Sequence, residues 1–287
     1  MELVPFVFCD SVVAALGAPS LIEEPLSSRV WQKAFTQHKQ NRISATIVIA
    51  YKEGIWSYEI YYFSEEFHDF TLTFEDLQKM SGKYFRITYI HIEQGSESNQ
   101  SSFEGILKLA KFTAPFVSMC ELEMQDVDDF KEDELCQLLS FYRNSSINSL
   151  HTSGNLDPIC AFLTEILKSD MLKNVSFYAD VSSAINEEIE EIALTKSFDF
   201  LSFKPQNFTR TFFEKLFARQ FDGFGKYTFR FFFDFKVADL KNFKEDLRIS
   251  ASDSSIKWRR VDGVVVTIET DNWDNSLYVD FVLEIVE

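Results

Sequence analysis

A nine-residue pattern that recurs every 25 to 30 residues constrains the fold of this chain more than any other sequence feature. It reads apolar-x-x-apolar-x-apolar-x-x-polar. Copies begin at Val117, Ile147, Leu172 and Phe198, and looser copies begin at Ile87 and Phe224. Helical periodicity follows in the intervening segments 103–112, 132–142, 161–167, 185–194 and 212–221. A regular period of this length indicates a stack of similar strand–helix units.

The period and the order of strand and helix are those of leucine-rich repeats. We therefore expect an α/β fold: a short N-terminal helical segment followed by a leucine-rich-repeat-like strand–helix solenoid with terminal β-hairpin caps. An ordinary α/β domain with right-handed crossovers is the alternative. The 31 phenylalanines, against 9 glycines and 6 prolines, favour a core built in layers.

Alternating residues at both ends of the repeat region predict capping strands. Residues 45–51 and 55–63 flank Lys52-Glu53-Gly54, a turn sequence that predicts a β-hairpin. Residues 257–261, 264–269 and 277–286 predict three strands that close over the last repeat. Caps of this kind are expected where a repeat stack would otherwise expose an apolar end.

The first 42 residues predict two short helices that form a segment separate from residues 43–287. Pro5 suits the first turn of a helix, and Gly17-Ala18-Pro19 ends it. The second helix follows Pro25, with a polar side that we expect to include Lys33 and His38. Two such helices are too small to be stable alone, so they must pack on the rest of the chain or on a partner.

Several residues of this segment resemble a known motif. Val4-Pro5-Phe6, the apolar helix after it, and Val30-Trp31 followed by Lys33-Ala34-Phe35 resemble the F-box. They resemble more closely the openings of a large, nematode-expanded family of F-box-like proteins with a leucine-rich-repeat-like C-terminal region. The resemblance covers about 40 of the 287 residues.

The resemblance implies that these helices bind the Skp-type adaptor of a cullin–RING ubiquitin ligase. The chain would then be a non-enzymatic substrate receptor. The residues expected to contact the adaptor are Val4, Pro5, Phe6, Phe8, Val12, Leu16, Val30, Trp31 and Phe35. Two alternatives remain: the helices only seal the repeat stack, or the chain is a stoichiometric binder that neutralises its partner without recruiting a ligase.

In the predicted repeats, the third, fifth and seventh residues of each copy face away from the helices. We expect a target protein to bind there, and the candidate contacts are Tyr89, His91, Glu93, Glu121, Glu123, His151, Tyr178, Phe200, Lys204, Lys226 and Arg230. The stripe is acidic in its first copies and basic in its last, which suits a partner with a complementary charge gradient. The alternative is that these residues form only the solvated side of a sheet.

The formal net charge of −17 argues against general nucleic-acid binding. The charge favours encounter with a basic protein, or it simply solvates the outer faces of helices. Asp10 interrupts the N-terminal apolar run, and no run is long enough for a membrane span. Four cysteines without C-x-x-C spacing favour a reducing compartment, so we expect a cytoplasmic or nuclear protein.

The sequence contains none of the common motifs for catalysis or phosphate binding. It has only four histidines, His38, His68, His91 and His151, and none has H-E-x-x-H spacing. We therefore expect no catalytic residues, no metal site and no cofactor. An enzyme on an α/β fold remains the third hypothesis, and an open cleft with convergent titratable groups would favour it.

Overall fold

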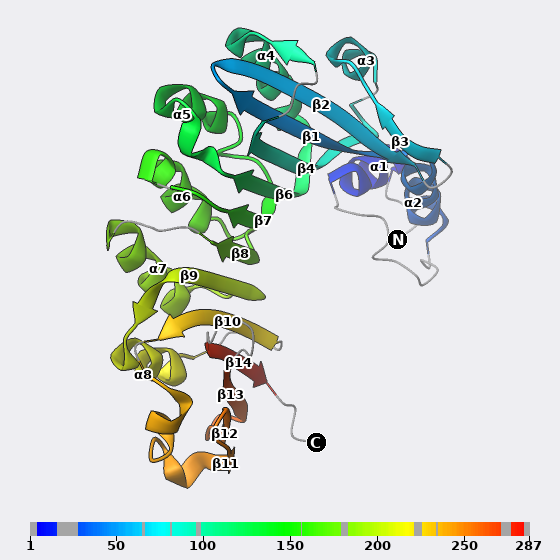
Figure 1. Cartoon of the computed structure of the whole chain (residues 1–287). Coiled ribbons are helices and arrows are strands. Elements are labelled where there is room, and N and C mark those ends of the chain that lie inside the picture. The colour runs from blue at the N-terminus through cyan, green and yellow to red at the C-terminus, as the bar shows by residue number, and fades with distance from the viewer. Residues whose placement is uncertain are drawn as a thin grey trace. The chain divides into compact units, whose positions relative to one another are not determined.

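The structure is a computed structural model that describes residues 5–15, 28–64, 67–80, 82–95, 99–155, 157–178, 183–220, 226–233, 235–270 and 277–283. The chain divides into two compact units, Met1–Asn148 and Ser149–Glu287. Both combine helices with a set of parallel strands that antiparallel strands extend, and the α/β class is as the sequence predicts (Figure 1). The domain boundary predicted after residue 42 lies inside the first unit and stays a prediction.

The first unit places parallel strands beside an antiparallel hairpin. Its strands lie in the order β6-β4-β1-β2-β3, and β5 pairs with β2. Strands β1, β4 and β6 are parallel, whereas β2 is antiparallel to its neighbours. The elements are α1 (Phe6–Ala15), α2 (Arg29–Asn41), β1 (Ile43–Lys52), β2 (Ile55–Ser64), β3 (Phe67–Thr71), α3 (Phe74–Lys79), β4 (Phe85–Gln94), β5 (Gln100–Ser101), α4 (Phe103–Thr113), β6 (Val117–Gln125) and α5 (Glu132–Ser140).

The predicted hairpin is confirmed as β1 and β2. Lys52 pairs with Ile55, so the loop is the two residues Glu53 and Gly54. Their φ angles of 50° and 88° are both positive, which gives the tight turn that matches the twist of paired strands. Strands β3 and β5 and helix α3 were not predicted, because each is too short to show a clear period.

A layer of helices covers one face of these strands. Helix α4 begins after Ser102, whose hydroxyl accepts a hydrogen bond from the Gly105 N–H at 3.2 Å. On the sheet side, the Trp56 ring packs against Phe103 at 5.2 Å and Phe130 at 5.4 Å, measured between ring centroids. The Trp56 indole N–H also donates to Glu134 Oε2 of α5 at 2.8 Å. Trp56 therefore joins strand β2 to the start of α4 and to α5.

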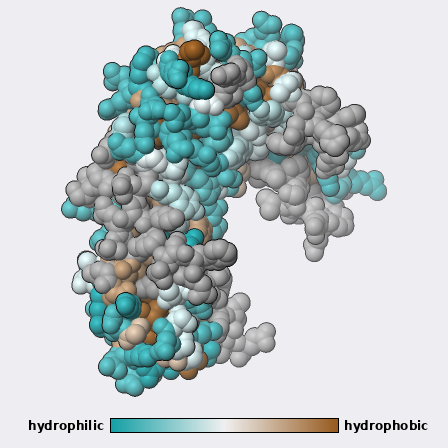
Figure 2. Space-filling view, in the orientation of Figure 1, coloured by the Kyte–Doolittle hydropathy of each residue, from teal (hydrophilic) through white to brown (hydrophobic). Residues whose placement is uncertain are grey.

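The outer surface of this helical layer is polar. Figure 2 shows mostly hydrophilic side chains over α4 and α5. This is the pattern expected of amphipathic helices that bury one face and solvate the other.

The second unit has strands in the order β7-β8-β9-β10-β14-β13-β12-β11. Pairing is parallel from β7 to β10 and antiparallel from β10 to β11. The elements are β7 (Ile147–Thr152, which starts just before the boundary), α6 (Cys160–Leu167), β8 (Asn174–Phe177), α7 (Ser183–Thr195), β9 (Phe200–Phe208), α8 (Arg210–Ala218), β10 (Lys226–Phe233), β11 (Arg248–Ala251), β12 (Ser255–Arg259), β13 (Val264–Thr270) and β14 (Leu277–Leu283).

The three predicted C-terminal strands are confirmed as β12, β13 and β14, but their place differs from the prediction. Strand β14 pairs edge to edge with β10, so these strands extend the sheet and do not close over its last repeat. A fourth strand, β11, was not predicted and pairs with β12. Strand β11 therefore lies at the outer edge of this set of strands. It is short, and its pairing with β12 is irregular near Arg248. Short, charged and irregular strands are common at sheet edges, where they discourage further pairing.

Phenylalanines fill the core of the second unit. Phe208 lies 4.6 Å from Phe231 and 4.8 Å from Phe212, measured between ring centroids. A second group forms where α8 meets β12: Phe213 and Phe217 pack within 6.2 and 5.6 Å of Trp258. The high phenylalanine content thus produces aromatic contacts between helix and sheet, in line with the expected layered core.

Basic side chains cap three successive helices of the second unit. In each case the donor comes from a later segment of the chain and reaches the carbonyls at the helix C-terminus, where positive charge is favourable. The contacts are Lys196 Nζ to Leu167 O of α6 (2.9 Å), Arg219 to Ala193 O of α7 (2.7 Å) and Arg260 to Phe217 O of α8 (2.7 Å). Burial lowers the pKa of Lys196 to about 8.

Candidate protein-binding surfaces

Helices α1 and α2 pack against each other as a small hairpin, which we call the α1–α2 hairpin. Its core consists of Cys9 and Val13 of α1 with Ala34 of α2. Four larger residues, Phe6, Val30, Trp31 and Phe35, pack around this core and are only partly buried. So small a core does not stabilise two helices alone, and further contacts must hold the hairpin.

Polar contacts hold the two helices together and attach them to the residues at the start of β4. The Asp10 carboxylate of α1 lies 3.1 Å from His38 Nε2 of α2 and 2.8 Å from Lys83 Nζ. Arg42 donates to Val13 O at 3.0 Å, and Arg86 donates to Ala14 O. Both arginines therefore neutralise the negative C-terminal end of α1.

His38 is the main departure from the sequence prediction for this segment. We expected it on the polar side of α2, but its side chain is fully buried and faces Asp10. Its ring also contacts Tyr84, with centroids 5.0 Å apart. Helical spacing does place residue 38 one turn after Ala34, on the inner face. This spacing is the sequence signal that the polar-side assignment overlooked.

The electrostatics of this contact make it sensitive to acid. Burial lowers the pKa of His38 below its ordinary value, and the nearby Arg42 and Lys83 act in the same direction against the opposing effect of Asp10. Burial would raise the pKa of Asp10, but its contacts with Lys83 and His38 outweigh burial and lower it. Folding thus favours neutral His38 beside ionised Asp10.

Acidification below about pH 6.5, the ordinary pKa of histidine, is therefore expected to weaken the attachment of the hairpin. The unfolded chain binds protons more readily at both groups, so stability is full above pH 6.5 and falls as the pH falls. Hydrogen exchange of residues 6–15 and 29–41, corrected for intrinsic rates, should accelerate from pH 7.5 to 5.5. In His38→Gln this added acceleration should be absent; an equal acceleration in that variant would contradict the prediction.

The hairpin leaves part of α1 uncovered. Val7 is 73% exposed and Phe8 54% exposed, and Pro5 is exposed as well. The edge of the Phe8 ring meets Trp31, with centroids 6.3 Å apart. Of the predicted adaptor contacts, Phe6, Val12, Val30, Trp31 and Phe35 are partly buried, and Val4 and Leu16 lie outside the described residues. Val7 was not among the predicted contacts, although it lies between Phe6 and Phe8, which were.

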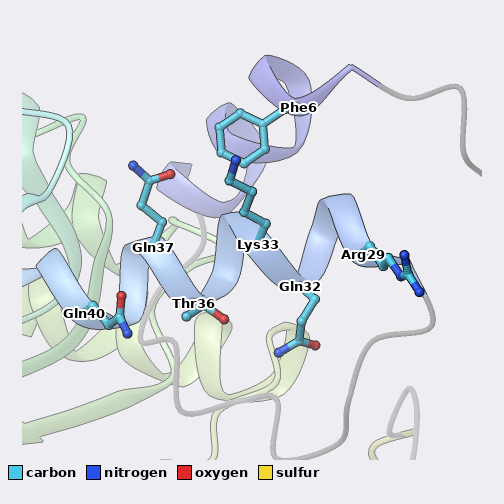
Figure 3. A pocket seen from close by; sticks show the side chains of 7 residues that line it. All are labelled: Phe6, Arg29, Gln32, Lys33, Thr36, Gln37 and Gln40. Atoms are coloured by element: carbon cyan, nitrogen blue, oxygen red, sulfur yellow. The ribbon is translucent and has the colours of Figure 1, made fainter.

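A groove runs along α2 on another side of the hairpin (Figure 3). Its volume is about 820 Å³, and its described lining residues are Phe6, Arg29, Gln32, Lys33, Thr36, Gln37 and Gln40. The α2 residues form one stripe at helical spacing. The Lys33 ammonium lies over the Phe6 ring, 5.3 Å from its centroid.

In the first unit, the sheet face opposite α4 and α5 carries the predicted acidic residues. Tyr89, His91 and Glu93 of β4 share this face with Glu121 and Glu123 of β6. Tyr89 donates a hydrogen bond to Glu123, and His91 Nε2 lies 3.8 Å from Glu93 Oε2. Burial raises the pKa of the Tyr89 hydroxyl, and Glu123 raises it further. Tyr89 therefore remains neutral and acts as a donor to the carboxylate.

One detail of the register on this face differs from the repeat pattern. The pattern aligns Tyr89 with Met119, but Tyr89 pairs with Glu121, because β6 bulges after Val117. Met119 has a φ of 49° within the bulge and an exposed side chain. A bulge inserts unpaired residues and shifts all later pairs, and a pattern of apolar positions cannot reveal it.

The second unit presents a more neutral face. His151, Ser176, Ser202 and Arg230 lie in one cross-strand row. Phe200 is in the adjacent row and is partly buried, and Tyr178 is exposed at the end of β8. The pattern aligns Lys226 with Phe200, but Thr228 occupies that place, two residues later. The side chains of Lys204 and Lys226 lie outside the described residues. Of the three predicted basic residues, the structure therefore describes the side chain of Arg230.

The part of the chain described by the structure holds no group of three or more histidine, cysteine or acidic residues that could bind a metal ion. Cys9 and Cys120 are buried, Cys160 is partly buried and Cys136 is exposed, and none of these four forms a disulfide. Burial raises the pKa of the Cys120 thiol, which makes it a poor nucleophile. Within the described ranges, no helix is long and apolar enough to cross a bilayer.

No protein-family model, curated protein or solved structure matches this chain. A function is therefore inferred from the surfaces described above and from the resemblance carried by the first 42 residues.

Proposed function

We propose that this chain is a non-enzymatic protein-binding protein, the substrate receptor of a Skp–cullin–F-box type ubiquitin ligase. The α1–α2 hairpin docks onto the Skp-type adaptor, and the sheet faces hold the target protein. A function of this kind belongs in the cytoplasm or the nucleus. The exposure of Val7 and Phe8, on a hairpin fixed to the first unit by polar contacts, is the observation that carries the proposal.

A hairpin that served only to seal the sheet would turn its large apolar residues inward. Here the side chains that contact the rest of the first unit are Asp10, which pairs with Lys83, and His38, whose ring meets Tyr84. Val7 and Phe8 face solvent instead. Neighbouring exposed apolar residues on a rigid element are typical of a protein-binding site, and aromatic side chains often dominate its binding energy.

The finer architecture, a leucine-rich-repeat-like solenoid, is part of the same proposal. Its support is the alternation of strand and helix in each unit, with four strands that begin at or near the predicted positions: Val117, Ile147, Asn174 and Phe200. A target would contact the strand face that the helices leave open. The acidic side chains on that face of the first unit favour a target with a basic surface.

Binding of a recombinant Skp-type adaptor, measured by titration calorimetry, tests the proposal. We expect Val7→Asp combined with Phe8→Asp to weaken binding by at least about 30-fold, the effect of losing a central aromatic contact. Both residues are exposed, so the double variant should fold normally.

Ile55→Asp is the matched control, because Ile55 is an apolar residue of similar exposure at the start of β2, next to the turn of the β1–β2 hairpin. It should bind the adaptor like the unchanged chain. If the unchanged chain does not bind, or if Val7→Asp/Phe8→Asp binds equally well, adaptor docking is wrong. The chain would then act as a stoichiometric binder that neutralises its target.

A further inference from the structure

We infer that the groove along α2 accepts an acidic segment of the protein that docks on the hairpin. This inference deepens the proposed function and rests on it for the identity of the partner. Val7 and Phe8 would supply the apolar contact, and the groove would bind acidic residues of the same partner. We call the residues that line it, Phe6, Arg29, Gln32, Lys33, Thr36, Gln37 and Gln40, the α2 groove.

The α2 groove has the shape of a peptide site. Its lining residues occur at intervals of three and four along α2, so they form one straight stripe over most of the helix. Long side chains that carry amides and charges dominate the stripe (Figure 3). The stems of these side chains and the Phe6 ring give the groove an apolar floor, and their ends carry amides and charges. A stripe of this kind, open along its length, suits an extended or helical amphipathic segment of another protein.

Among the described residues of the two helices, basic residues outnumber acidic ones, whereas the whole chain is acidic. The described residues 5–15 and 28–42 contain four basic residues, Arg29, Lys33, Lys39 and Arg42. Their single acidic residue is Asp10, which already contacts His38 and Lys83. The chain as a whole has a formal net charge of −17. Salt screens charges beyond about 8–10 Å, so a segment lying on α2 responds mainly to these local cations.

The positions of Arg29 and Lys33, near the N-terminus of α2, do not stabilise the helix. They lie one turn apart, where two like charges repel. They also occupy the N-terminal part of α2, whose first turn has no acidic residue to balance the helix dipole. A carboxylate bound between them would remove both unfavourable terms. The Phe6 ring holds the Lys33 ammonium at the wall of the groove. The Arg29 guanidinium can donate two hydrogen bonds to the oxygens of one carboxylate.

The probe for this inference is a short, fluorescently labelled amphipathic peptide with glutamates on one helical face and leucines on the other. We expect the full chain to bind it, with an affinity that falls as salt rises. Arg29→Glu combined with Lys33→Glu should weaken binding about tenfold or more, because two attractions become repulsions. This variant places acidic residues near the N-terminus of α2, which favours the helix, so loss of binding would not reflect unfolding.

Lys39→Glu combined with Lys111→Glu is the matched control. It makes the same change in net charge at two exposed lysines outside the groove, and it should bind the peptide nearly as well as the unchanged chain. Carbodiimide cross-linking should join peptide carboxylates to Lys33 in preference to Lys39. Equal losses in both double variants, absence of peptide binding, or cross-links that avoid Lys33 would each overturn the inference.

The adaptor separates this inference from the proposed function. If the adaptor binds, and Arg29→Glu/Lys33→Glu weakens its binding while the lysine control does not, both stand. If the peptide result holds but the adaptor never binds, the groove is an acidic-peptide site and the adaptor is the wrong partner. If adaptor binding depends on Val7 and Phe8 but neither ligand responds to Arg29→Glu/Lys33→Glu, the groove inference alone fails.

Discussion

Phe213→Ala is expected to lower the free energy of unfolding of the second unit by about 3–5 kcal/mol, the range for truncating a buried phenylalanine. Phe213 is fully buried on α8. Its ring lies 5.6 Å from Phe243 and 6.2 Å from Trp258, between centroids, so it attaches strand β12 to the helix. Alanine would leave a cavity among rings that cannot move together to fill it.

Hydrogen exchange in the full chain measures this effect locally. Amides of β12 and β13 should lose protection in Phe213→Ala, while those of β1 and β4 in the first unit should not. Phe213→Leu should show a smaller loss because it keeps most of the apolar volume. Val261→Thr changes a residue that is 96% exposed and should have no effect. Unchanged protection of β12 in Phe213→Ala would show that the aromatic group does not hold this strand.

Trp56→Ala is expected to destabilise the first unit by a similar amount, about 3–5 kcal/mol. The Trp56 side chain is almost fully buried and packs against the rings of Tyr51, Phe103 and Phe130. Its removal would loosen α4 and α5 from strand β2, so amides in all three elements should exchange faster.

Trp56→Phe separates packing from hydrogen bonding. It keeps an aromatic ring but removes the N–H that donates to Glu134, so we expect a loss of about 1 kcal/mol. The loss stays small because Glu134 also pairs with Lys131 at 3.0 Å. Ile55→Ala, at an exposed neighbouring position, should change little. If Trp56→Phe were as damaging as Trp56→Ala, the hydrogen bond would matter more than packing.

The order of the longer strands and helices was predictable because each repeats its apolar residues at a fixed period, whereas the short elements β3, α3, β5 and β11 were missed. The segment 103–112 corresponds to α4, and the turn at Glu53-Gly54 was visible as a short sequence signal. The candidate contacts on β4 and β6 also point to the expected face, because alternation along a strand survives a shift of two residues. What failed was the register of individual pairs.

Register failed where the backbone departs from regular geometry. The bulge at Met119 depends on φ and ψ, which leave no periodic trace in the sequence. The carboxylate partner of His38, Asp10, likewise lies 28 residues away in the sequence, and no local pattern links the two. The α2 groove was not predicted either, because its stripe looks like an ordinary solvated helix face until Phe6 is placed at its edge.

Hydrogen–deuterium exchange of the full chain, with and without a saturating Skp-type adaptor, tests adaptor docking most directly. We expect slower exchange in α1 and α2, strongest around Val7 and Phe8, and no change in α6, α7 or α8. We also expect Val7→Asp/Phe8→Asp to remove this protection. Protection confined to the sheet faces, or none in α1 under conditions where the adaptor is saturating, would contradict the proposal that the hairpin is the adaptor-docking element.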